Sequence, residues 1–353
     1  MTETTKKRRP VKRWIILALF AAGIYAAFIG PSILKPVSPV VVMPAEPTGL
    51  AIFGFQITNT ILATLITDVL LILLAVGAYR FSKTGSLVPK GFYNAFEAIF
   101  EFLWNSVHGA AGKWAKRIFP VPATIFLIIF TANMIKLLPG FESIGQLKQV
   151  HEGTGYAPVK LFNIGKLNVY TIDKGHPVDV AAAVEHSSES ETGAETEAHG
   201  EENSELCTAC EVMPFLRGSA TDLNFPFALA VITVLMTQVY GVWAQGPGYF
   251  SKFFPVKQLV SGNMFGIINF AVGILELLLE FAKILSFGFR LFGNIFAGAL
   301  LLSIVGALTA VVVPAGLYLF EVFFGIIQAY VFFLLATMFI SGATVGHHAE
   351  EHH

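Results

Sequence analysis

Residues 274–305 read ILELLLEFAKILSFGFRLFGNIFAGALLLSIV, inside an apolar run that extends from 264 to 306. As one helix this run would be about 65 Å long, roughly twice the hydrocarbon thickness of a bilayer. It contains isolated glycines but no turn sequence, so of a vertical hairpin and a steeply tilted helix we favour the tilted helix, supported by neighbouring protein. Arg290 stands within the run, and a guanidinium at the centre of a membrane helix costs about 2.5–3.5 kcal/mol. A charge retained at that cost indicates a functional site.

The rest of the sequence has the composition of a polytopic membrane protein. Of 353 residues, 54% are hydrophobic and 13% charged, and the mean hydropathy is +0.66. The formal net charge of −1 gives no indication of nucleic-acid binding. Runs long enough to cross about 30 Å of hydrocarbon predict about six membrane segments in an all-α fold, ending in a long tilted helical hairpin. The runs lie at 14–34, 57–79, 121–139, 223–244, 264–306 and 314–342.

The distribution of Lys and Arg predicts the orientation. Six precede the first run, six lie in 80–119 and two in 245–263, whereas 35–56 holds one and 307–313 none. By the positive-inside rule both termini are cytoplasmic and the loop 140–222 is extracytoplasmic. The first run is too long for a usual signal peptide and lacks a clear cleavage site, so we interpret it as a retained anchor.

The chain is expected to have five parts. They are a basic N-terminus with an extra anchor and a short outer segment (1–56), membrane helices (57–139), an acidic insertion (140–222), a membrane core (223–345) and a His/Glu tail (346–353). Within 90–119, apolar residues recur at three- and four-residue steps, at Phe92, Phe96, Ile99, Leu103 and Val107. This pattern predicts an amphipathic helix, either at the cytoplasmic interface or packed on another subunit.

The insertion 140–222 carries 14 acidic residues against five basic ones. Low hydrophobicity and clustered negative charge predict that 181–205 is mobile, either as a solvated spacer or as a loop that gathers cations. Cys207 and Cys210, at its end, are interpreted as a small disulfide loop or as two thiols without a role. A single CxxC favours these readings over a metal site, and none is assigned.

On a helix through 264–306, six polar residues fall on one seam, because steps of three, four and seven stay close in angle. They are Glu276, Glu280, Lys283, Ser286, Arg290 and Asn294. Glu321 and Gln328 share a face of the last run. If the hairpin turns near Thr309, position 290 faces 328 and position 297 faces 321. Glu276, Glu280 and Lys283 are by themselves more typical of an internally satisfied ion-pair cluster near a membrane boundary. For Asn294 and Gln328, interhelical hydrogen bonds that only hold the bundle together are as typical as a functional role.

SFGFRLFGNIFAG, with LELLLEFAKILS before it and GIIQAYVF after it, resembles subunit a of the rotary F-type ATP synthase. TDLNFPFALAVITVLM at 221–236 and TANMIKLLPG at 131–140 are similar to two further helices of that family. The resemblance covers about 57–345 except the insertion 150–215. It implies a stator subunit with two offset aqueous half-channels, through which protons load and unload the carboxylates of a ring of c subunits.

By that resemblance, Arg290 faces each passing ring carboxylate and prevents protons from leaking between the half-channels. Four residues would line the outer half-channel or flank the arginine, namely Asn294, Glu276, Glu321 and Gln328. Secondary roles would fall to Glu280, Lys283 and Ser286. Family members often carry an acidic residue where this chain has Ala299, and several carry His in place of Glu321. We therefore assign the titratable relay to Glu321. Some relatives are acidic at Lys136, which we expect to extend to the outer interface.

The resemblance implies no cofactor and no catalysis by this chain alone, since the nucleotide sites lie on other subunits. The implied partners are the c ring, b-type peripheral stalk subunits, the whole complex and the bilayer of a bacterial cell membrane. Two other functional classes remain as alternatives. A self-contained secondary transporter or channel would usually show internal repeats, and we find no second RLFGN region. A non-conducting scaffold would leave Arg290 unexplained.

Overall fold

The computed structural model describes residues 45–52, 54–83, 91–138, 141–142, 144–150, 154–164, 167–179, 207, 209–253, 264–308 and 312–345, with Ala21 and Tyr25. The chain divides into two compact units. The larger unit consists of Val42–Glu142, Leu216–Gly298 and Glu321–His353, and the smaller of Met1–Val41, Ser143–Phe215 and Ala299–Phe320. Most of the run 14–34, the acidic run 181–205 and the tail 346–353 lie outside the described residues.

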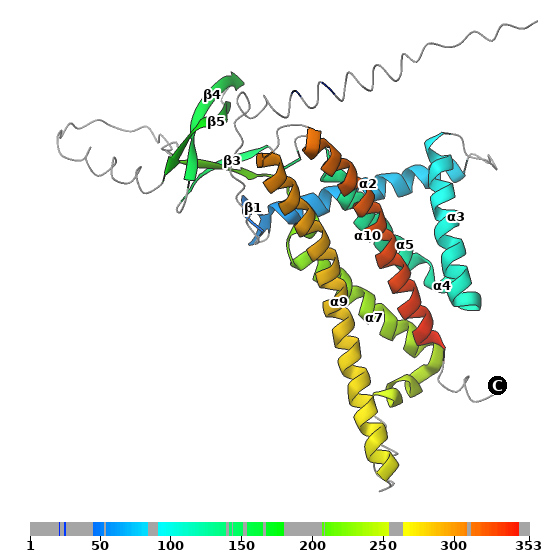
Figure 1. The fold of residues 1–353 in the computed structure, drawn as a ribbon. Coiled ribbons are helices and arrows are strands. Elements are labelled where there is room, and N and C mark those ends of the chain that lie inside the picture. Colours follow the sequence, from blue (N-terminus) through cyan, green and yellow to red (C-terminus); the bar gives the residue numbers. More distant parts are fainter. Residues whose placement is uncertain are drawn as a thin grey trace, which may run out of the picture. The chain divides into compact units, whose positions relative to one another are not determined.

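The helices follow the apolar runs of the sequence (Figure 1). They are α2 (Asn59–Ser82), α3 (Phe92–Ala111), α4 (Ala115–Ile118), α5 (Pro120–Ile135), α7 (Asn224–Gln245), α9 (Met264–Leu308) and α10 (Val312–Thr344). The run 264–306 is one continuous helix, as we favoured, and not a vertical hairpin. In the described residues, three helices are individually long and apolar enough to span a membrane, or up to four if a bent pair counts as one. The all-α membrane fold is confirmed, and the count of six segments stays a prediction.

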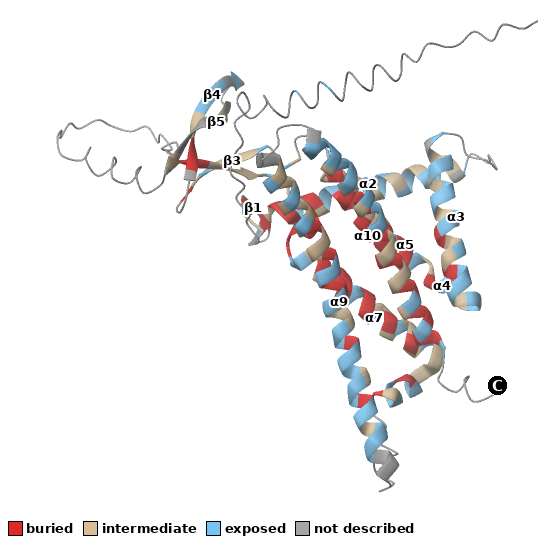
Figure 2. Ribbon diagram, in the orientation of Figure 1, coloured by how far each residue is buried: buried red, intermediate tan, exposed pale blue. Residues whose placement is uncertain are grey.

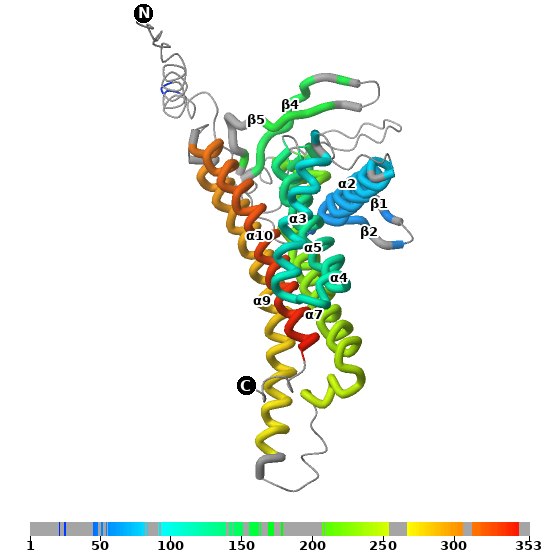
Figure 3. The backbone as a smooth tube through the Cα atoms, turned by 90° about the vertical axis from the view of Figure 1, so that its right-hand side faces the viewer, coloured from blue at the N-terminus to red at the C-terminus, as the bar shows by residue number. Residues whose placement is uncertain are grey.

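The core of the larger unit lies where α3, α5, α9 and α10 meet (Figure 2). Phe287 and Leu291 of α9 pack with Phe332 of α10, and all three are fully buried. Phe287 contacts Phe332 at 4.6 Å and Phe339 at 5.4 Å between ring centroids. Such interdigitation matters because lipid is as apolar as these side chains, so close packing must hold the helices together. The ring contacts fix α9 and α10 side by side in antiparallel register (Figure 3).

The amphipathic helix predicted within 90–119 is α3. Its apolar stripe is used inside this chain, since Leu103 and Val107 are completely buried in the core while Glu97 and Glu101 are exposed. The segment Tyr93–Ile118 meets α5 at an angle of 97°. Pro120 occupies the first position of α5, where a proline's missing N–H costs nothing. The apolar face of α3 therefore packs on neighbouring helices of its own subunit.

Two small antiparallel sheets were not foreseen. In the larger unit, β1 (Pro47–Ile52) pairs with β2 (Phe55–Thr58) ahead of α2. In the smaller unit, β3 (Gly145–Gln149), β4 (Thr154–Ile164), β5 (Leu167–Asp179) and β6 (Cys210–Pro214) form a sheet in the order β3-β6-β4-β5. The overlooked signal is the alternation in VKLFNI and LNVYTI around a short turn, which is typical of a hairpin. Cys207 is joined by a disulfide to Cys210, the first residue of β6.

Asp222 joins α2 to the start of α7. Its Oδ1 accepts hydrogen bonds from the backbone N–H of Asn224 (2.6 Å) and Phe225 (3.3 Å), and its Oδ2 accepts one from Thr60 Oγ1 (2.6 Å). The carboxylate is 4% exposed. It thus satisfies helix N-terminal donors that have no intrahelical partner.

Replacement of Asp222 by Ala is expected to destabilise the subunit by about 2 kcal/mol, because a helix cap and a buried hydrogen bond are lost together. Thr60→Val removes the interhelical bond and the hydroxyl contact with Thr58 (3.1 Å) but keeps the cap, and should cost about half as much. The measurement is the thermal midpoint of unfolding of the detergent-purified protein. Equal midpoints for Asp222→Ala and wild type would refute the capping role.

Candidate functional site

The pairing of α9 with α10 brings Asn294 and Gln328 together. Asn294 Nδ2 donates a hydrogen bond of 3.3 Å to Gln328 Oε1. The expected register, with 290 facing 328 and 297 facing 321, is therefore wrong: Gln328 contacts Asn294, four residues after Arg290, and Gly298, one residue after Ala297, adjoins Glu321. α9 ends at Leu308 and α10 begins at Val312, and Thr309 lies outside the described residues.

Gln328 also carries a donor without an acceptor. Its side chain is 6% exposed, and its Nε2 makes no hydrogen bond within the described part of the chain. An unsatisfied buried amide costs about 1–3 kcal/mol, so native structures rarely retain one without a reason. The pair therefore leaves a buried amide donor unpaired beside the Asn294 amide.

Arg290 lies one turn from Asn294 on α9, and its side chain is exposed. No residue that the structure describes forms a hydrogen bond, ion pair or ring contact with it. Its neighbours Phe287 and Leu291 point into the core, so the guanidinium leaves the helix on a different side. A permanently charged group on the outside of a membrane helix requires a polar or anionic neighbour, because lipid tails provide none.

Glu321 is paired with Lys136. The Lys136 ammonium at the end of α5 donates to Glu321 Oε1 of α10, and the two side chains are only 7% and 13% exposed. The expectation that Lys136 extends to the outer interface is wrong, because this carboxylate lies within its reach inside the bundle. One turn away, Asn133 Nδ2 donates to the carbonyl of Gly325 (3.3 Å), which fixes α5 against α10.

Glycines make room for this ion pair. A Cβ at Gly298 would lie 3.4 Å from Glu321 Oε1, so α9 comes close to the carboxylate. A Cβ at Gly218 would lie 3.2 Å from Lys136 Cδ, and the Gly218 N–H donates to Glu142 Oε1 (3.0 Å). Gly218 thus lies between Glu142 and the Lys136 side chain, and Gln328 follows Glu321 seven residues later on α10.

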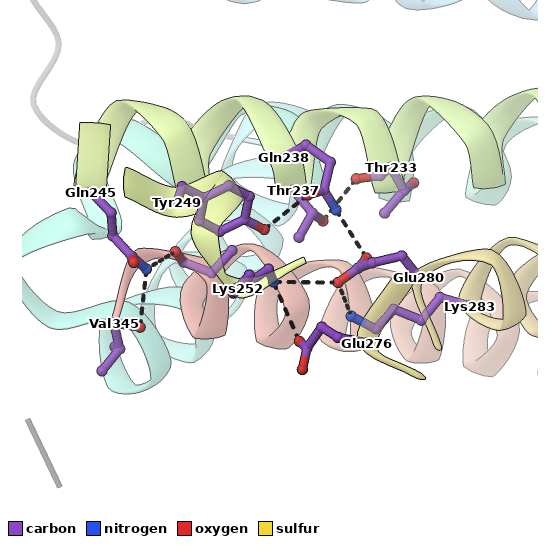
Figure 4. Close-up of polar contacts among 11 residues, drawn as sticks. Thr233, Thr237, Gln238, Gln245, Tyr249, Lys252, Glu276, Glu280, Lys283 and Val345 are labelled. Carbon is purple, nitrogen blue, oxygen red and sulfur yellow. Dashed lines mark hydrogen bonds and ion pairs between the residues drawn. The ribbon is translucent and has the colours of Figure 1, made fainter. Parts of the chain in front are cut away.

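Glu276, Glu280 and Lys283 form a separate cluster (Figure 4). Glu280 is 7% exposed; its Oε1 accepts from Lys283 Nζ (2.8 Å), and its Oε2 accepts from Gln238 Nε2 of α7 (2.9 Å). Lys252 Nζ approaches Glu276 Oε1 (3.4 Å) and Glu280 Oε1 (3.7 Å). The sequence suggested an ion-pair cluster as one reading of these residues, and the structure contains it.

The predicted polar seam is therefore divided between two places. Asn294 lies with Gln328, whereas Glu276, fourteen residues before Arg290, lies about 21 Å away along α9. Ser286 is exposed between them. Sequence reasoning missed the partners Gln238, Tyr249 and Lys252, since they come from α7 and from the short helix η3 (Gly246–Lys252) and share no spacing pattern with α9.

Comparison with known proteins identifies related sequences. The family model described as "ATP synthase A chain" matches residues 61–341. The chain is 25% identical over 298 residues to "ATP synthase subunit a, sodium ion specific" of Propionigenium modestum, covering 83% of this chain and 76% of that protein. It is 27% identical over 301 residues to ATP synthase subunit a of Mycobacterium bovis, covering 84% and 90%. The corresponding protein of Campylobacter jejuni is 23% identical over 267 residues, covering 75% and 81%.

Proposed function

Because the chain belongs to the ATP synthase A chain family, and is thus a multi-pass membrane component of an F-type ATP synthase complex, we propose that it is the ion-conducting stator subunit. In this proposal it provides two offset half-channels that load and unload protons on the carboxylates of a ring of c subunits. Proton flow then drives ring rotation with about 2.3 kcal/mol per charge per 100 mV, in addition to the pH gradient.

The exposed Arg290 carries this proposal. Its guanidinium has no counter-charge among the described residues of its own chain, although α9 is packed along its other side. A ring carboxylate passing this face would supply the missing negative charge. The fixed positive charge would hold that carboxylate ionised and keep protons from crossing directly between the half-channels.

The first half-channel would run along the polar groups that lead from Glu142 to Arg290. Glu321 is the titratable group on this route, and a relay needs one that can bind and release a proton. Lys136 lies on the route as its counter-charge. Gln328 and Asn294 would then orient a water molecule that passes the proton to the ring carboxylate beside the arginine.

The second half-channel would begin on the other side of Arg290. Ser286 is the next polar residue along α9, followed by the cluster of Lys283, Glu280 and Glu276. Glu276 was expected to line the outer half-channel, and this proposal assigns it to the second half-channel instead. It lies eighteen residues before Asn294 on α9, a distance of about 27 Å along the helix.

The assembly follows from the same proposal. The face of α9 that carries Arg290 would meet the c ring, and other membrane surfaces would meet b-type stalk subunits. The basic residues before and between the apolar runs favour cytoplasmic termini and an extracytoplasmic sheet β3–β6. The bacterial relatives support residence in a bacterial cell membrane. Nucleotide sites would lie on other subunits.

Replacement of Glu321 by Gln tests the relay. The rate of ATP synthesis driven by an imposed proton gradient should fall about tenfold, because a proton-binding group is lost from the route. The assay uses the whole complex in vesicles, and Glu101→Gln, which neutralises an exposed carboxyl on α3, serves as the matched control. Unchanged synthesis by Glu321→Gln in a fully assembled complex would exclude Glu321 as the relay.

A further inference from the structure

A basic and aromatic surface lies at one end of the larger unit, away from the proposed ion route. The turn that joins α3 to α5 reads GKWAKRI and presents Lys113, Lys116 and Arg117, all exposed. None of the three forms an ion pair with an acidic residue in the described ranges. The cations inside the bundle differ, since Lys136, Lys252 and Lys283 each have a carboxylate partner.

Two tryptophans hold Arg117 in place. Its guanidinium carbon lies 5.3 Å from the ring of Trp114 and 4.7 Å from that of Trp243, and the two rings meet edge to face at 6.1 Å. Tyr240 of α7 donates a hydrogen bond from its hydroxyl to the Arg117 carbonyl (2.8 Å). The turn is thus fixed to the end of α7, and the guanidinium is ordered although it is exposed.

This combination is typical of the boundary between hydrocarbon and headgroups. Tryptophan and tyrosine gather at that level, and basic groups there attract anionic lipids. The turn directly precedes α5, and Tyr240 and Trp243 lie near the end of α7. Two apolar helices therefore bring these residues to one end of the bundle, where we expect the membrane boundary. A guanidinium stacked on rings keeps its N–H edge free for a phosphate oxygen.

We propose that Lys113, Lys116 and Arg117, supported by Trp114, Tyr240 and Trp243, bind the phosphate groups of anionic phospholipids in the adjoining leaflet. Each negatively charged headgroup supplies a counter-charge that no described acidic residue provides to this surface. The bound lipid would join the turn to α7 and so stabilise the sharp bend between α3 and α5.

The test compares lipid binding by the whole complex in mixed bilayer discs of phosphatidylglycerol and phosphatidylcholine. Lys113→Gln with Lys116→Gln should weaken retention of phosphatidylglycerol about fivefold for each charge removed. Arg117→Gln should do the same, whereas Arg117→Lys should restore only part of the binding, because an ammonium is a point charge without the planar fork. Millimolar inorganic phosphate should not displace the lipid.

Arg80→Gln with Lys83→Gln is the matched control, since it removes two exposed cations from the end of α2. Equal loss of phosphatidylglycerol in the two double variants would mean that bulk positive charge alone attracts lipid, and the proposed site would be wrong. Retention at the wild-type level in Arg117→Gln would also overturn it. Lipid retention is measured without ion flow, so this outcome is independent of the proposed function.

Discussion

In Arg290→Ala, ATP synthesis driven by a proton gradient is expected to disappear, while passive proton leak through the membrane part persists or rises. The guanidinium is the fixed positive charge that would force each ring carboxylate to ionise as it passes. Without it, a protonated carboxyl could move between the half-channels without delivering its proton to the correct side. Because Arg290 has no partner among the described residues of this chain, its removal should leave the packing of α9 intact.

The measurement pairs ATP synthesis with proton leak in vesicles that contain the whole complex. Arg290→Lys keeps a positive charge but loses the planar fork, so partial coupling is expected. Arg80→Ala, at an exposed position on α2, controls for loss of a positive charge as such. If Arg290→Ala assembles and makes ATP at the wild-type rate, the guanidinium is structural and the proposed function fails.

Lys136→Glu is expected to have the second largest effect. It would place two carboxylates against each other where an ion pair is now almost completely enclosed. Breaking a buried pair costs about 3–5 kcal/mol, because a charge is left without compensation. We expect this variant to lose ion-driven ATP synthesis and much of its incorporation into the complex.

A double variant with the two charges exchanged tests whether Lys136 and Glu321 act as a pair. Lys136→Glu combined with Glu321→Lys restores one positive and one negative group in the same place, and assembly should recover beyond the sum of the single effects. Lys148→Glu, on the exposed face of β3, is the charge-matched control. Additive losses in the double variant would show that Lys136 and Glu321 act independently, contrary to their contact.

The positions of the helices were predictable because a bilayer demands long apolar runs and satisfied backbone groups. The predicted runs 223–244 and 264–306 became α7 and α9 with ends displaced by no more than two residues. Asn294 and Gln328 were singled out because fixed helical steps relate them to Arg290 and Glu321, but their contact with each other was not predicted, since it depends on the register of α9 against α10. The sheet β3–β6 was missed because the acidic composition of 140–222 concealed short alternating strands.

The sequence by itself determined a polytopic helical membrane protein with one anomalous arginine, because apolar length and helical period are local properties of the chain. Only the tertiary structure decided which charges meet. Lys136 and Glu321 are 185 positions apart, and Lys252 reaches Glu276 from a different helix. Such pairs depend on the register of helices packed by interlocking side chains, and that register is set by rings such as Phe287 and Phe332. No periodicity within a single helix contains that information.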